Sequence, residues 1–148
     1  MWREGLTLAL GAWSLQALAL MFGAYLGLRG LFDPRWAQRL VRLQADEQSG
    51  GFAEFRATYG GLFLAVHLAA LFFTIKWIIG GEITLGVFAT GAAAVASAAW
   101  FGAAAGRALS MWRDGTRTPF NEISCGIECS MGILVGAPWL LWFFSPPG

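Results

Sequence analysis

The sequence predicts an all-α integral membrane protein, a four-helix bundle with a short amphipathic interfacial helix between helices 1 and 2. Three observations lead to this prediction. Hydrophobic residues make up 57% of the 148 residues, and charged residues make up only 13%, about half the share that is usual in soluble domains. The mean hydropathy is +0.57. Four stretches also reach the roughly 20 apolar residues that cross a bilayer: 6–28, 57–79, 83–105 and 123–144.

Each of these stretches is continuously apolar, which favours helices, because a membrane β-barrel would alternate apolar and polar residues in segments of about ten. The length suits one transmembrane domain, residues 1–148, and leaves no room for a separate catalytic domain. The first stretch has no small-residue cleavage site after its apolar core, so we expect a retained span.

Positive charge predicts the orientation, because Lys and Arg accumulate in cytoplasmic loops. Arginines flank the first and third connections: Arg29, Arg35, Arg39, Arg42, Arg56, Arg107, Arg113 and Arg117. Only Arg3 and Lys76 fall on the other side. We therefore expect a multi-pass protein of the bacterial inner (cytoplasmic) membrane with both termini on the periplasmic side. The net charge of +1 leaves no basic stripe for nucleic acid.

The first connection predicts the interfacial helix, at about 34–48. Asp33 can cap it, Pro34 suits its first position, and two glycines at 50 and 51 can end it. Apolar residues at i, i+4 and i+7 form one side, beside a row of arginines: Trp36, Leu40 and Leu43, then Arg35, Arg39 and Arg42. This pattern fits an amphipathic connector on the cytoplasmic surface or an element that docks a partner.

Small residues predict where helices pack closely. The stretch 86–106 is mostly Ala and Gly, which predicts that the third span lies at the centre of the bundle. Small-xxx-small pairs recur at Gly23 and Gly27, Gly102 and Gly106, and Gly132 and Gly136. Internal packing of the bundle explains these pairs, and self-association or a partner subunit is the alternative.

Polar residues gather at the cytoplasmic ends of the second, third and fourth spans. The candidates are Glu54, Arg56, Tyr59, Arg107, Ser110, Asp114, Asn121, Glu122 and Glu128. Glu128 is the most informative, because a carboxylate more than a turn inside a span needs a partner, for which Arg107 and Arg56 are the candidates. A structural ion pair is one interpretation of this cluster, and a substrate, lipid-headgroup or proton site is the other.

Three further residues raise the question of a metal or a cofactor. Cys125 and Cys129 share one helix face, but two thiolates lack the remaining ligands of a zinc site, so we interpret them as packing residues. His67 lies in the middle of the second span. It could ligate a haem or a chlorophyll-type pigment, or it could make an interhelical hydrogen bond.

Two segments, EFRATYGGLFLAVHLAALFF at 54–73 and GRALSMWRDGTRTPFNEI at 106–123, and the Glu in the last span resemble a bacterial family of small four-helix membrane proteins, domain of unknown function 4345. The most specific positions are Glu54, Arg56, Tyr59, Gly60, Gly61, Gly106, Arg107, Ser110, Asp114, Gly115 and Glu128. The resemblance implies no activity. It does imply that the cytoplasmic polar residues form a shared structural or binding site, whereas His67 and the cysteines have no match in the family pattern.

From these observations we expect a non-catalytic accessory or structural subunit of a bacterial inner-membrane complex, respiratory or photosynthetic. The small size and the lack of a catalytic constellation motivate this expectation. Its partners would be the lipid bilayer and other membrane subunits or a second copy of the chain. The alternative is a small membrane enzyme, or a protein that binds a lipid or pigment, using the cytoplasmic Glu/Arg cluster.

Overall fold

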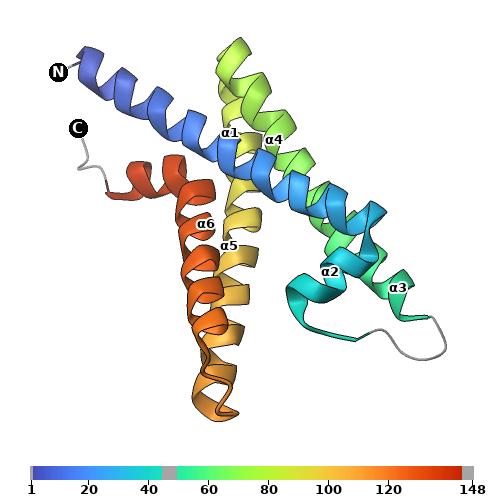
Figure 1. Cartoon of the computed structure of the whole chain (residues 1–148). Helices are drawn as coiled ribbons and strands as arrows, with labels where there is room; N and C mark the ends of the chain where they lie inside the picture. Colours follow the sequence, from blue (N-terminus) through green and yellow to red (C-terminus); the bar gives the residue numbers. More distant parts are fainter. Residues whose placement is uncertain (1, 45–49, 145–148) are drawn as a thin grey trace.

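The computed structural model describes residues 2–44 and 50–144, and helices dominate it (Figure 1). They are α1 (Trp2–Phe32), α2 (Pro34–Val41), α3 (Gly51–Glu54), the π-helix η1 (Phe55–Leu62), α4 (Phe63–Gly80), α5 (Ile83–Arg113) and α6 (Pro119–Phe144). The described residues contain no strand. The predicted all-α fold class is confirmed.

Four helical segments are long and apolar enough to cross a membrane: Leu8–Phe32, Gly51–Gly80, Ile83–Arg113 and Pro119–Leu141. The second of these joins α3, η1 and α4 end to end. The chain is therefore a multi-pass membrane protein. The helices are longer than the apolar stretches of the sequence. Helix α5, for example, continues past residue 105 to Arg113.

Helix α2 is shorter than the predicted 34–48. It begins as predicted, with the Asp33 carboxylate accepting a hydrogen bond from the Trp36 backbone N–H at 3.0 Å and with Pro34 in the first turn. It ends at Val41 because Arg42 adopts the left-handed conformation (φ 59°, ψ 30°) that terminates helices. Residues 45–48 of the predicted helix lie outside the described part.

The long helices pack as two pairs that cross. Helices α5 and α6 form an antiparallel hairpin, α1 packs along η1 and α4, and α1 also crosses α6. In Figure 1 the beginning of α1 and the end of α6 lie toward one end of the molecule, while α2 and the α5–α6 turn lie toward the other. The polar connections predicted to share one side of the membrane therefore lie at one end of the bundle.

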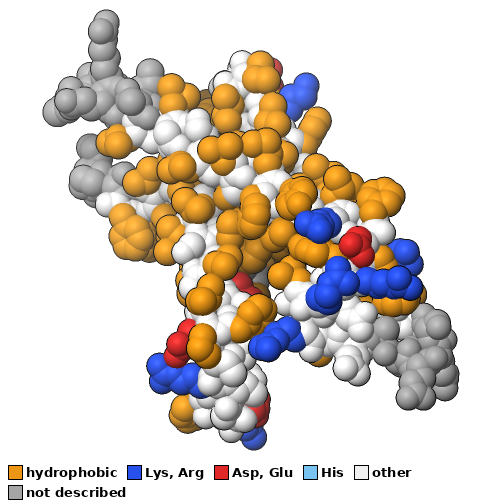
Figure 2. Space-filling view, in the orientation of Figure 1, with side chains coloured by type: hydrophobic (Ala, Val, Ile, Leu, Met, Phe, Trp, Pro, Cys, Tyr) orange, Lys and Arg blue, Asp and Glu red, His pale blue; other side chains and the backbone are white. Residues whose placement is uncertain are grey.

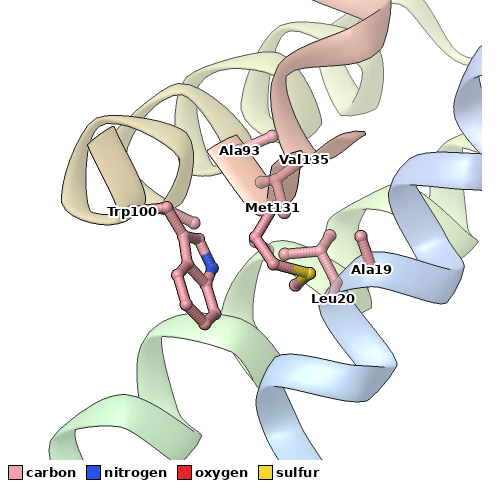
Figure 3. Close-up of a cluster of buried hydrophobic side chains, with 8 residues drawn as sticks. Ala19, Leu20, Ala93, Trp100, Met131 and Val135 are labelled. Atoms are coloured by element: carbon pink, nitrogen blue, oxygen red, sulfur yellow. The ribbon is translucent and has the colours of Figure 1, made fainter. Parts of the chain in front are cut away.

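The buried core contains many small side chains, which let the helices approach closely. Figure 3 shows Met131 and Val135 of α6 near Leu20 and Ala19 of α1, with Ala93 and Trp100 of α5 completing the cluster. Ala70 of α4 and Ala96 of α5 belong to the same cluster. This core joins all four spans.

The closest backbone approaches lie between α1 and the continuous helical segment formed by η1 and α4. A methyl group on Gly60 would come within 2.6 Å of the Leu31 backbone, and one on Gly27 would come within 2.5 Å of the Leu64 backbone N. Only glycine permits such proximity, since a shift of either backbone would be needed to fit a Cβ. The π-helix, which the sequence analysis did not predict, is therefore held against α1 by direct backbone packing.

Candidate functional site

The ion pair of Arg107 and Glu128 lies in the α5–α6 hairpin, near the arginine-rich end of the bundle. Arg107 Nη2 donates to Glu128 Oε1 at 2.6 Å, and Arg107 Nε donates to Oε2 at 2.9 Å. Arg107 Nη1 also donates to the Asn121 amide oxygen at 3.2 Å. The Glu128 side chain is 11% exposed and that of Arg107 is 31% exposed. The carboxylate thus has the charged partner that its depth requires, and that partner is Arg107 rather than Arg56.

The remaining candidates of the cytoplasmic cluster do not converge on this pair. Arg56 is exposed and donates from Nε to the Leu31 carbonyl of α1 at 3.2 Å. Glu54 and Tyr59 are exposed, and the Tyr59 ring lies 5.7 Å from that of Phe55. Among the described residues, no hydrogen bond or ion pair joins Glu54 of α3, or Arg56 and Tyr59 of η1, to Arg107 or Glu128. The sequence grouped residues that the structure places in two neighbourhoods.

Ser110 and Asp114 belong to the end of α5. The Ser110 hydroxyl lies 3.0 Å from that of Thr116, and the backbone N–H of Asp114 donates to the Ser110 carbonyl at 2.9 Å as the helix ends. Asn121 reaches the same turn by donating its amide to the Thr116 carbonyl at 2.7 Å. Asn121 therefore connects the turn to the ion pair.

His67 lies at the centre of the bundle and is 1% exposed. The indole N–H of Trp100 on α5 donates to its Nε2 at 3.0 Å, and its Nδ1 donates to the Phe63 carbonyl at 2.7 Å. These bonds together require the neutral tautomer with the proton on Nδ1. The ring joins α4 to α5, and a haem or pigment metal could reach Nε2 only by displacing Trp100.

Of the two cysteines on α6, Cys125 contacts α5. The Cys125 thiol donates to the Ala104 carbonyl with a sulfur–oxygen distance of 3.6 Å, and both cysteines are half-buried. In the part of the chain that is described, no group of three His, Cys, Asp or Glu residues could hold a metal ion.

Two buried polar contacts were missed by the sequence analysis. Gln16 of α1 is fully buried and donates from Nε2 to the Thr74 hydroxyl of α4 at 2.8 Å. Ser97 of α5 donates to the Gly132 carbonyl of α6 at 2.7 Å. The available signal was a Gln near the middle of the first apolar stretch, since a polar residue at that depth needs a partner.

The three predicted small-residue pairs have different environments. A Cβ on Gly23 would meet His67, and Cβ atoms on Gly132 and Gly136 would meet Phe101 and Ser97, all at 2.9 Å or less. By contrast, a Cβ on Gly102 or Gly106 would meet nothing within 4 Å. We call the exposed residues Gly91, Ala98, Gly102 and Gly106 the α5 small-residue face. This face is not used for packing within the described chain.

The fold and these contacts define a small multi-pass membrane protein whose buried polar groups tie its helices together. The chain belongs to the family described as Domain of unknown function (DUF4345), whose model matches residues 12–143. This confirms the resemblance seen in the sequence. No curated protein and no solved structure matches the chain.

Proposed function

We propose that this chain is a non-catalytic accessory subunit of a bacterial inner-membrane assembly, and that it docks a transmembrane helix of another subunit on the α5 small-residue face. The observation that carries the proposal is the open space in front of Gly91, Gly102 and Gly106. Small residues in lipid allow close helix contact, which supplies the packing energy that the hydrophobic effect cannot supply there. The occupant we infer is therefore another membrane helix.

The contrast among the glycine pairs supports this inference. Gly23 and Gly27 face α4, and Gly132 and Gly136 face α5, so these pairs already hold the chain's own helices. Gly102 and Gly106 have the same i, i+4 spacing without such a neighbour. The central polar groups are also engaged within the bundle. Glu128 is held by Arg107, which also donates to Asn121, and His67 is held by Trp100 and Phe63.

We further propose that both termini lie on the periplasmic side. Most charged side chains gather in the lower part of the face seen in Figure 2, over α2 and the end of the α5–α6 hairpin, while hydrophobic side chains cover most of the rest. The arginines at that end would face the cytoplasm according to the positive-inside rule. Arg3, near the start of α1, and Lys76, near the other end of α4, are the exceptions among the described basic residues.

Native purification tests the subunit proposal. Membranes of the source cells are solubilised in a mild detergent, and the chain is followed on a native gel with mass spectrometry of its band. We expect it to migrate in a band that contains at least one other integral membrane polypeptide in a fixed ratio. Migration as a monomer, or as an oligomer of this chain alone, would contradict the proposal.

A further inference from the structure

An open pocket of about 380 Å³ lies beside α2, and its lining includes neither the Arg107–Glu128 pair nor any residue of the α5 small-residue face. Three arginines line it, Arg35 and Arg39 from α2 and Arg42 from its C-terminal cap. The polar and aromatic part of the lining also includes Gln38 of α2, Gln44 after this helix, and Phe52 of α3. Figure 2 shows Lys and Arg side chains gathered over this part of the molecule.

The arginines of this pocket lack acidic partners among the described residues. Arg35 and Arg39 are exposed, and the ion pairs of the described chain involve Arg107 and Arg117 instead. The Arg42 guanidinium lies 4.7 Å from the centre of the Phe120 ring, a contact that leaves its charge uncompensated. Three guanidinium groups around one pocket, with amide N–H groups beside them, are suited to an oxyanion such as a phosphate group.

The position of α2 indicates where that phosphate group comes from. The helix follows directly on the first span, since the Asp33 N–H still donates to the Arg29 carbonyl at 2.8 Å. Leu40 and Leu43, next to the arginines, are 45% and 53% exposed. A short helix at the end of a span, with exposed leucines in it and just after it beside arginines, lies at the boundary between headgroups and acyl chains. Its arginines then reach the level of the lipid phosphates.

We propose that this pocket binds the phosphate group of an anionic phospholipid. Arg35, Arg39 and Arg42 contact the phosphate oxygens, and the exposed Leu40 and Leu43 contact the first carbons of the acyl chains. An anionic lipid is preferred over a zwitterionic one, because the choline or ethanolamine group would bring a second positive charge close to the arginines. The proposal is independent of what docks on α5.

Lipid titration of the purified full-length chain tests this binding site. The chain is titrated in mild detergent with dioleoyl phosphatidylglycerol or dioleoyl phosphatidylcholine, and bound lipid is counted by native mass spectrometry. We expect phosphatidylglycerol to bind about tenfold more tightly or better, and Arg39→Gln to weaken it about fivefold, the effect of one arginine near a membrane surface. Arg39→Lys keeps the charge without the guanidinium fork and should weaken it less.

The matched control is Arg113→Gln, which removes an exposed arginine from the end of α5, on the same side of the membrane and outside the pocket. We expect it to bind phosphatidylglycerol as the wild type does. Equal affinity for both lipids, or equal losses in the Arg39 and Arg113 variants, would overturn the proposal. Displacement of the lipid by excess inorganic phosphate would assign the pocket to free phosphate and overturn the lipid assignment. Both substituted side chains are exposed, and circular dichroism verifies that each variant is folded.

Discussion

Gly23 of α1 lies directly against the imidazole ring of His67 on α4: a methyl group at Gly23 would come within 2.0 Å of His67 Cδ2. The ring cannot move away easily, because Trp100 and the Phe63 carbonyl hold its two nitrogens. We therefore predict that Gly23→Ala destabilises the protein by about 1–3 kcal/mol, the usual cost of overpacking. Thermal unfolding in detergent measures it. The matched control Gly102→Ala, which adds a methyl group in open space, should change the stability little.

The second prediction concerns the contribution of the Arg107–Glu128 pair to stability. Glu128→Gln removes the charge that compensates Arg107, and we expect a loss of about 1–2 kcal/mol, below the range for fully buried pairs because Arg107 is partly exposed. Glu122→Gln, which breaks the exposed pair with Arg117, should cost less than about 1 kcal/mol. Replacement of both partners, Arg107→Met with Glu128→Leu, should recover much of the loss. Equal effects of the two single substitutions would argue against a structural role for Glu128.

Gln16 and Thr74 should respond in opposite directions to apolar substitution. The Gln16 Oε1 atom is buried without a hydrogen-bond partner among the described residues, so Gln16→Leu removes an unsatisfied group, and we expect unchanged or slightly higher stability. Thr74→Val leaves the Gln16 amide N–H without its acceptor and should cost about 1 kcal/mol. Chemical unfolding of both variants measures the difference. A large loss for Gln16→Leu would mean that its carbonyl has a partner elsewhere.

The proposed orientation can be checked with reporter fusions. Alkaline phosphatase, which is active only in the periplasm, should be active when fused after Gly148 and inactive when inserted after Gly115 in the α5–α6 turn. Green fluorescent protein at the same positions should give the inverse pattern. The reverse result at both positions would place the arginine-rich connections outside the cytoplasm and contradict the proposal.

The four spans could be predicted from the sequence because each depends on a local property, a run of apolar residues about as long as the bilayer is thick. The pairing of Glu128 with Arg107 could also be predicted, since both side chains lie at matching depths on helices joined by a short turn. The need for a partner follows from the cost of a carboxylate in the membrane. Depth along a span can be counted in the sequence.

The direction in which a side chain points around its helix axis cannot be counted in this way. The contacts that the sequence analysis did not predict depend on that direction. The predicted cluster combined Glu54, Arg56 and Tyr59 with Arg107 because they share a depth, but η1 packs with α1 while Arg107 belongs to the α5–α6 hairpin. The π-helix changes the rotation of these residues further, and no simple sequence rule predicts it. The Trp100–His67 bond likewise depends on which faces of α4 and α5 meet.

The most direct test of the proposed function is to block the α5 small-residue face. Gly102→Leu adds a large side chain there, and Gly11→Leu adds the same side chain to an equally open position on α1. Both variants are expressed in the source cells, extracted mildly and compared with the wild type on a native gel. We predict that Gly102→Leu migrates without its partner polypeptide while Gly11→Leu migrates with it. Comigration of Gly102→Leu with the same partner in the wild-type ratio would contradict the proposal.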